Sequence, residues 1–321
     1  MDGDSSPLGD QAEHELISTA LDVERLEVNM FRSKSLWLPR RARGVFGGQV
    51  ISQALVSATN CVDPIYALHV CTSMQCYFLL SASPATPIVY SVEVMRTGRS
   101  YMTCSVKAIQ NGAIIFVLLC SFQKPEPWQP EMQWQMPSGV PMPDECSLEE
   151  DIFLADSKRP GIDPRLKYFF ETYAEERRRS PISIKRAAEH QLTPEGHIRY
   201  MYWMRAKSIP KYDAPFQKCI LAYLSDLYFI MSVPRMIGLK RWAKGPDALG
   251  LVSSVDHTIH FYDNDFDCAD WLLYTMEGPR VASGRGIARG QLYTTSGTLV
   301  AVTTQEGVIR AQRRDPALSK L

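Results

Sequence analysis

Two stretches of the 321-residue chain carry regular hydrophobic patterns, and a proline-rich segment separates them. Around residue 50, apolar side chains recur every three to four positions, which is the period of a helix with a buried face. In Met102–Ala108, apolar and polar residues alternate, which is the period of a half-buried strand. The patterns predict a helix followed by strands in residues 17–123, and the same order in residues 198–312.

Each of these two blocks opens with a helix that is apolar nearly all round. The positions that share one helical face are Val50, Ile51, Ala54, Leu55 and Ala58 in the first block and Ile220, Tyr223, Leu224 and Leu227 in the second. Such helices are expected where a curved sheet encloses them. Asn111-Gly112 indicates a hairpin turn, because both positions tolerate positive φ. The apolar run Ala113–Cys120 that follows predicts a strand buried on both faces.

The two blocks match each other in the order and spacing of their elements. Phe78 precedes Gln123 by 45 residues, and Phe261 precedes Gln305 by 44. Repetition of this kind predicts a duplicated unit, in which one long helix is followed by an antiparallel sheet that wraps it. The expected fold class is therefore α+β, with two tandem units in one chain.

The segments outside the two blocks have other compositions. Residues 1–16 are polar and acidic and are expected to be disordered. Residues 124–197 contain many prolines, which predicts a linker, with one charged helix from about residue 165 to 179. Residues 313–321 form a polar tail. The longest purely apolar run is far shorter than a membrane span, so membrane insertion is not expected.

Charge and cysteine spacing exclude several classes of protein. The formal net charge is zero, whereas nucleic-acid-binding proteins usually carry a basic excess. None of the eight cysteines is paired as Cys-x-x-Cys, which argues against a zinc ribbon or a thioredoxin-like site. His257 and His260 would point to opposite faces of a strand, which is unsuitable for one metal ion. We therefore expect no metal and no nucleic-acid partner.

The last three residues are Ser319, Lys320 and Leu321. This tripeptide at a C-terminus is the peroxisomal address that an import receptor reads. The preceding residues are polar and include Pro316, so the signal is expected to be exposed. The sequence predicts localisation in peroxisomes, with the import receptor as a partner.

Several ordered motifs together resemble one enzyme family. They are Phe46-Gly47-Gly48-Gln49 after Trp37-Leu38-Pro39, then Cys76-Tyr77-Phe78, Arg96-Thr97-Gly98-Arg99-Ser100, Ser225-Asp226-Leu227, Asp256-His257-Thr258 and Gln305-Glu306-Gly307-Val308. The chain resembles the TesB-like type II acyl-CoA thioesterases, including the peroxisomal members. The resemblance implies a double hot-dog fold and hydrolysis of acyl-CoA to a carboxylic acid and coenzyme A, with no cofactor because coenzyme A is part of the substrate.

Carried over motif by motif, the family's catalytic Asp, Ser or Thr, and Gln correspond to Asp226, Ser254 and Gln305. These residue types suit thioester hydrolysis, which needs a base for water and polar groups that orient it. Asp226 has apolar neighbours one helical turn away, and burial of a carboxylate raises its pKa toward that of a useful base. Ser254 and Gln305 both donate and accept hydrogen bonds, so together they can hold a water molecule.

A second set of residues is expected to bind the substrate. Gly47, Gly48 and Gln49 open a helix, and this start suits either an oxyanion or phosphate site or a plain helix terminus. Arg96 and Arg99 are candidates for coenzyme A phosphates, with a solvated surface as the alternative. The set is completed by His257, expected to order the strand near Ser254, and by Gln75.

Gln75 marks a departure from the family, whose members often carry His-x-x-His where this chain has Thr72 and Gln75. The departure leaves two alternatives open, namely a thioesterase specialised for one pathway intermediate and a non-catalytic acyl-CoA-binding paralogue. A hot-dog enoyl-CoA hydratase is disfavoured, since neither helix carries an Asp and His pair. The first unit has Gln53-Ala54 near the helix position of Asp226 and only Gln123 in place of Gln305, which predicts one catalytic site per chain. A homo-oligomer is possible.

Overall fold

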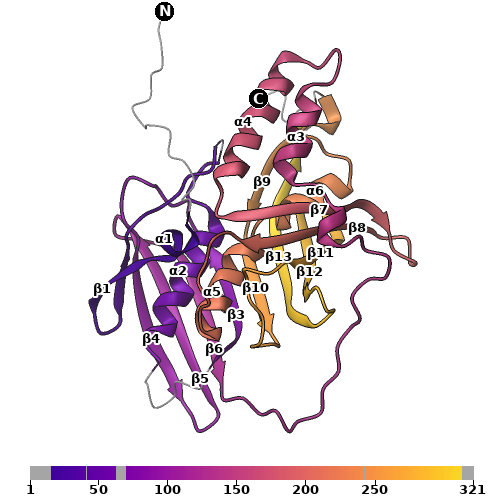
Figure 1. Ribbon diagram of the computed structural model, residues 1–321. Coiled ribbons are helices and arrows are strands. Elements are labelled where there is room, and N and C mark those ends of the chain that lie inside the picture. Colours follow the sequence, from indigo (N-terminus) through magenta and orange to yellow (C-terminus); the bar gives the residue numbers. More distant parts are fainter. Residues whose placement is uncertain (1–15, 41, 63–69, 242, 244, 313–321) are drawn as a thin grey trace, which may run out of the picture.

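The computed structural model describes residues 16–40, 42–62, 70–241, 243 and 245–312 (Figure 1). The predictions for the tail 313–321, for its Ser319-Lys320-Leu321 signal and for almost all of residues 1–16 lie outside the described residues. The helices are α1 (Ile17–Leu21), α2 (Gly47–Thr59), α3 (Glu149–Ser157), α4 (Pro164–Arg179), α5 (Ala214–Ser225) and α6 (Phe229–Met236), with short 3₁₀ turns η2 (Pro143–Glu145) and η3 (Gly245–Asp247).

The strands of the first half are β1 (Val23–Glu27), β2 (Met30–Ser33), β3 (Val70–Phe78), β4 (Val89–Thr97), β5 (Tyr101–Gln110) and β6 (Ala113–Gln123). Those of the second half are β7 (Ile182–Leu192), β8 (Ile198–Ala206), β9 (Leu249–Ser254), β10 (Asp256–Phe261), β11 (Leu272–Ala282), β12 (Arg285–Thr294) and β13 (Leu299–Ala311). Long strands with few interruptions follow from the period-two patterning of both blocks.

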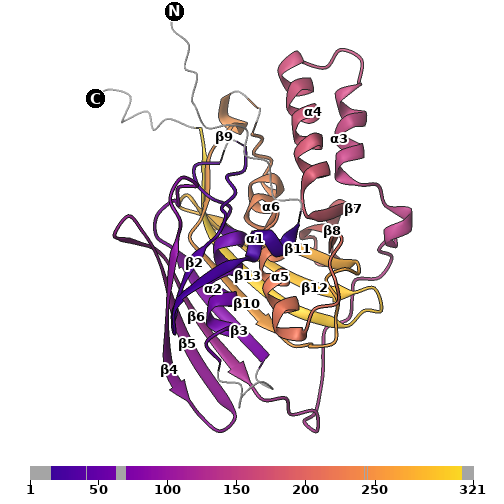
Figure 2. The ribbon, with the colours of Figure 1, turned by 60° about the vertical axis from the view of Figure 1, so that its left-hand side comes forward.

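The strands pair antiparallel in one sheet, in the order β1-β2-β4-β5-β6-β3-β10-β13-β12-β11-β8-β7, with β9 paired to β13. Read outward from the β3–β10 junction, the halves have the same order, because β6, β5, β4, β2 and β1 correspond to β13, β12, β11, β8 and β7. Figure 2 shows α2 and α5 side by side between the two halves of the sheet. The predicted duplication of a helix-plus-sheet unit is confirmed.

Strand β7 corrects the predicted linker. It lies inside residues 124–197, yet it pairs with β8 from Ile182↔Ala206 onward. The sheet of the second unit therefore begins at Ile182 and not at residue 198. The strand escaped notice because Lys185, Arg186 and the residues that follow mask the apolar alternation, and two bulges shift the register.

Helix α2 is enclosed on all sides, as predicted. Every residue from Gly48 to Ala58 is buried, including the polar Gln49, Ser52, Gln53 and Ser57. The hydroxyl of Ser52 donates to the carbonyl of Gly48, and that of Ser57 donates to the carbonyl of Gln53. The two hydroxyls are thus satisfied within the helix, whereas the amides of Gln49 and Gln53 donate outside it, to the carbonyls of Ala20 and Ser35. Burial of each large apolar side chain contributes about 1.5–3 kcal/mol.

The interpretation of the hairpin that follows is half right. Asn111 and Gly112 adopt φ values of 51° and 77°, as the turn requires, and Met102, Cys104, Val106 and Ala108 of β5 are buried. The prediction that residues 113–120 are buried on both faces is wrong, because Ile114 and Leu119 are each 42% exposed. No described segment covers that outer face, whereas residues 136–146 pack against the outer face of the second half around Trp203 and Tyr293.

The stretch Ala214–Met236, which contains α5 and α6, is long and apolar enough to cross a membrane, and 72% of its most apolar window is buried. Burial of this kind is that of a core helix, since its apolar surface packs against α2 and the sheet. Within the described residues, packing of the core therefore accounts for the hydropathy of this stretch.

Candidate active site

Asp226 stands at the C-cap of α5, where the helical hydrogen-bond ladder stops. The sequence analysis placed it within a continuous helix; the structure instead breaks the helix at Asp226–Tyr228 before α6 begins at Phe229. Tyr228 has a φ of 62°, a left-handed conformation that is unusual for a bulky residue. The break lets the Asp226 side chain leave the helix surface and turn toward the sheet.

The three predicted catalytic residues converge at this break. Gln305 Nε2 donates to Asp226 Oδ1 at 2.7 Å and to Ser254 Oγ at 3.0 Å. Ser254 ends β9 and is paired with Gly307 of β13, which is two residues beyond Gln305. Three elements that are far apart in the sequence thus deliver a carboxylate, an amide and a hydroxyl to one point.

The first unit closes the other side of this cluster with the N-terminus of α2. The backbone N–H of Gly48 donates to the Asp226 carboxylate. A β-carbon added to Gly47 would lie 2.8 Å from Asp226 Oδ2, so only glycine admits the carboxylate there. The positive end of the α2 dipole also favours negative charge at this point. Of the predicted binding residues, Gly47 and Gly48 are therefore at the cluster.

Burial dominates the electrostatics of Asp226. It raises the pKa of the carboxyl above its ordinary value, and hydrogen bonds from Gln305 and Gly48 offset part of that increase. Gln305 is fully buried, and its Oε1 has no hydrogen-bond partner within the described residues. An acceptor left open next to a base of raised pKa can bind a water molecule and orient it.

His257 is not part of the cluster. It is fully buried on the helix side of β10, and its Nε2 lies 2.9 Å from Ser225 Oγ. Burial lowers the pKa of His257 to about 3, so the ring is neutral. His257 therefore contacts Ser225, the residue that precedes Asp226, and its role in substrate binding stays a prediction. His260 points to the other face, and among the described residues no three potential metal ligands gather.

Gln49 has a structural position that the sequence did not reveal. Its side chain is fully buried, accepts from the backbone N–H of Trp37 at 2.8 Å and donates to the carbonyls of Ala20 and Ser35. With both ends of the amide engaged, Gln49 holds α1 and the chain before α2. The structure does not place it as a substrate-binding residue.

Gln75, Arg96 and Arg99 are not brought to the cluster either. Gln75 is exposed, on the face of β3 opposite to the buried Met74 and Cys76. Period-two alternation puts it on the outer face of the sheet, away from the helices. The two arginines are exposed, and register places them near the Val70 end of β3, whereas Phe78 at its other end is beside Ser254 and Gly47.

The counterpart of Asp226 in the first unit is Asn60 and not Gln53. Asn60 is the C-cap of α2, as Asp226 is the C-cap of α5. Gln53 is buried about two helical turns earlier and bonds to Ala20 and Tyr90. An amide in place of the carboxylate supplies no base. One catalytic site per chain thus stays the prediction, and the residue that lacks the carboxylate in the first unit is Asn60 instead of Gln53.

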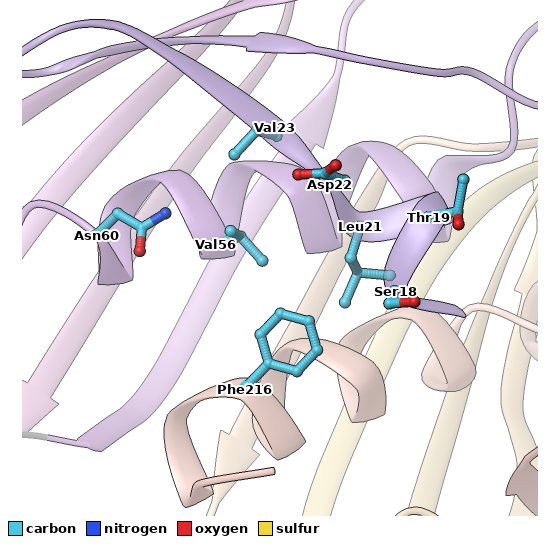
Figure 3. A pocket seen from close by; sticks show the side chains of 8 residues that line it. All are labelled: Ser18, Thr19, Leu21, Asp22, Val23, Val56, Asn60 and Phe216. Atoms are coloured by element: carbon cyan, nitrogen blue, oxygen red, sulfur yellow. The ribbon is translucent and has the colours of Figure 1, made fainter. Parts of the chain in front are cut away.

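A cavity of about 400 Å³ lies where the C-terminal end of α2 meets the N-terminal end of α5 (Figure 3). Its lining residues are Ser18, Thr19, Leu21, Asp22, Val23, Val56, Asn60 and Phe216. Because the 13 residues of α2 span about 20 Å, this cavity is separated from the Gly47–Asp226 contact by most of a helix length. It is not part of the three-residue cluster.

Gly48→Ala is expected to destabilise the protein by about 1–3 kcal/mol, the usual cost of overpacking. The new β-carbon would meet the Phe46 ring at 2.5 Å and the backbone carbonyl of Tyr223 at 2.7 Å, and the backbone cannot move aside cheaply. Thermal unfolding measures the effect. Gly112→Ala is the comparison for backbone strain without a clash, because Gly112 has open space around it but a φ of 77°. An unchanged Tm for Gly48→Ala would show that α2 and α5 are less tightly packed than the structure has them.

Comparison with solved structures places this arrangement in a class. The crystal structure of the acyl-CoA thioesterase II TesB2 from Mycobacterium marinum superposes with a TM-score of 0.70, covers 94% of this chain and 99% of its own, and is 30% identical. The fold is therefore the double hot-dog, as predicted from the sequence, and the class of protein is a hot-dog thioester hydrolase.

Sequence comparison gives the family. A family model for the acyl-CoA thioesterase N-terminal domain matches residues 35–123, and one for the C-terminal domain matches residues 143–309. Human acyl-coenzyme A thioesterase 8 is 33% identical over 303 residues, which is 92% of this chain and 89% of that protein. Peroxisomal acyl-coenzyme A thioester hydrolase 1 of Saccharomyces cerevisiae is 25% identical, over 86% and 89% of the two chains. The chain belongs to the TesB-like type II acyl-CoA thioesterases.

Proposed function

We propose that this enzyme hydrolyses acyl-CoA at the Asp226–Ser254–Gln305 cluster, with a water molecule as the nucleophile. The observation that carries the proposal is the geometry of Gln305, whose Nε2 bridges Asp226 and Ser254 while its buried Oε1 has no partner among the described residues. Ser254 accepts from Gln305 through an oxygen that would otherwise attack, so we assign the hydroxyl to water binding and not to covalent catalysis.

In the proposed reaction, Gln305 Oε1 and Ser254 hold the water, and Asp226 takes one of its protons. The water oxygen attacks the thioester carbonyl carbon, and negative charge develops on the carbonyl oxygen near the N-terminus of α2. The C–S bond then breaks, and the proton on Asp226 passes to the coenzyme A sulfur. The products are a carboxylic acid and coenzyme A, and the proposal uses no metal or cofactor.

One assay separates the alternatives. Purified protein is mixed with acyl-CoA thioesters of several chain lengths, and free thiol, 3-hydroxyacyl-CoA and bound ligand are measured. Thiol release across chain lengths supports a general thioesterase, whereas release from a single substrate supports a specialised one. Saturable binding without thiol release would refute hydrolysis. A hydratase product is not expected, because His257 pairs with Ser225 and not with a carboxylate.

We also propose that the enzyme acts in peroxisomes. The support is Ser319-Lys320-Leu321, together with the peroxisomal name of the yeast relative. Deletion of these three residues is expected to leave a fluorescently tagged protein in the cytosol with kcat unchanged, since a receptor reads the signal and the site does not include it. Microscopy measures the location, and a Leu321→Ala variant is the milder comparison. Import of the truncated protein would refute this reading.

A further inference from the structure

The break between α5 and α6 is held in place from several sides. Before the break, Tyr274 donates to the carbonyl of Ser225 at 2.9 Å, and His257 lies 2.9 Å from the Ser225 hydroxyl. These contacts come from β11 and β10 and fix the residue before Asp226. These two contacts do not reach the residues after Asp226, where Tyr228 takes its left-handed conformation.

After the break, the contact comes from outside the repeated unit. Tyr173 of α4 donates from its hydroxyl to the hydroxyl of Tyr228 at 2.8 Å. The Tyr228 ring also packs on Tyr202, with centroids 5.3 Å apart. A left-handed tyrosine costs free energy and persists only where its surroundings hold it. The Tyr173 hydroxyl is the polar contact that reaches this ring from the α3–α4 hairpin.

The hairpin is itself fastened to the far end of α6. Arg186 bonds to Glu149 of α3 at 2.9 Å and to Glu189 at 3.0 Å. Glu189 in turn pairs with Arg235 in the last turn of α6. Glu149 is buried, so this network is partly shielded from solvent. The hairpin is therefore linked to the N-cap of α6 through Tyr173 and, by way of Arg186 and Glu189 of β7, to the last turn of α6.

We propose that Tyr173 and Tyr228 are positioning residues, through which the α3–α4 hairpin sets the direction of the Asp226 carboxylate. The proposal rests on the proposed role of Asp226 as the base. The chain thus uses a segment outside the two hot-dog units to complete the site. Tyr173 and Tyr228 were missed by the sequence analysis, and the one available signal was a tyrosine two residues after Asp226.

Loss of one hydroxyl should let the break relax and the carboxylate move. Displacement of a reacting group by a fraction of an ångström lowers the rate of the chemical step by about 10-fold or more. A carboxylate that reaches water is less desolvated, so its pKa falls toward the ordinary value and the acid limb of kcat moves to lower pH. The titratable groups that face Asp226 are Cys76 and Tyr274, and burial raises the pKa of each, so they stay neutral.

The test compares Tyr173→Phe, Tyr228→Phe and the double variant with Tyr168→Phe, a tyrosine of the same helix that is 62% exposed. Each single variant is expected to lower kcat about 10-fold with little change in KM, because the hydroxyl pair orients the base and does not bind substrate. The double variant should be no worse than either single one, since both remove the same contact. Tyr168→Phe should match the wild type.

The pH profile separates positioning from plain stability. A lower Tm with unchanged kcat and an unchanged acid limb, measured well below Tm, would overturn the proposal and leave the contact structural. Asp226→Asn is run beside these variants. If it keeps activity, the proposed mechanism fails; if it is inactive while Tyr173→Phe behaves as wild type, only the positioning role fails.

Discussion

Asp226→Asn is expected to lower kcat for acyl-CoA hydrolysis by about 10²–10⁴-fold, the usual contribution of a positioned general base. The amide is the same size and still accepts the hydrogen bond from Gln305, but it cannot take a proton from water. A thiol-release assay at saturating substrate measures the effect. The matched control is Asp213→Asn, which changes the carboxylate at the other end of the same helix, where Asp213 caps Phe216.

The substitution Asp226→Asn should lower kcat but should not lower the free energy of unfolding at high pH. Because the pKa of Asp226 is raised in the folded state, the native protein binds more protons than the unfolded chain between the ordinary and the raised pKa. The free energy of unfolding contributed by this group therefore falls as pH rises through that range. Asparagine has no such penalty, so the Tm of Asp226→Asn at pH 8 is expected to equal or exceed that of the wild type.

The activity of the wild type carries a further signature of this base. As pH falls, kcat should decline where Asp226 gains its proton, at a pH above the ordinary carboxyl value of about 4. A variant Asp226→Asn with wild-type kcat, or one whose Tm falls steeply at every pH, would contradict the assignment of Asp226 as a buried, functional carboxylate.

Gln305→Ala is expected to lower kcat by about 10²–10³-fold, the range seen when one preorganised polar group is removed from a hydrolytic site. The substitution removes the donor to Asp226 and to Ser254 together with the open acceptor Oε1. Without the donor, the pKa of Asp226 should rise further, so the acid limb of kcat moves to higher pH.

Gln123→Ala is the matched control. Gln123 lies at the end of β6, and β6 is the strand of the first unit that corresponds to β13, which carries Gln305. The C-cap of α2 is Asn60, which carries an amide where α5 has the carboxylate of Asp226, so Gln123 has no counterpart of Asp226 to orient. Equal losses in the two variants would show that the first unit is catalytic as well. An unchanged acid limb in Gln305→Ala would show that its contact with Asp226 is not made during turnover.

The sequence by itself determined the duplicated units, because periodicity is a local property. The period of 3.6 in the α2 stretch and the period of two in Met102–Ala108 required only one buried face per element. Asn111-Gly112 likewise defined its own turn through its backbone preferences. The candidates Asp226, Ser254 and Gln305 came from the order of the motifs, which can be matched to a family without knowing which side chains touch.

Tertiary structure decided everything that depends on which face meets which neighbour. Period-two alternation cannot say whether Gln75 points toward the helices or toward solvent, and only the pairing of β3 with β6 and β10 settles this. Gln49 looked like a ligand-facing residue until its partners on α1 were seen. The edge strand β7 was hidden because charged residues are tolerated where one side of a strand faces solvent.

The helix break at Asp226 was also decided by tertiary structure, because no local sequence signal favours it. Leu227 and Tyr228 are ordinary helix residues, and propensity alone would continue α5 into α6. The left-handed conformation of Tyr228 is held by a hydroxyl 55 residues away, on α4. The free energy that sets the direction of the Asp226 carboxylate comes from contacts between distant segments, and such contacts exist only once the chain has folded.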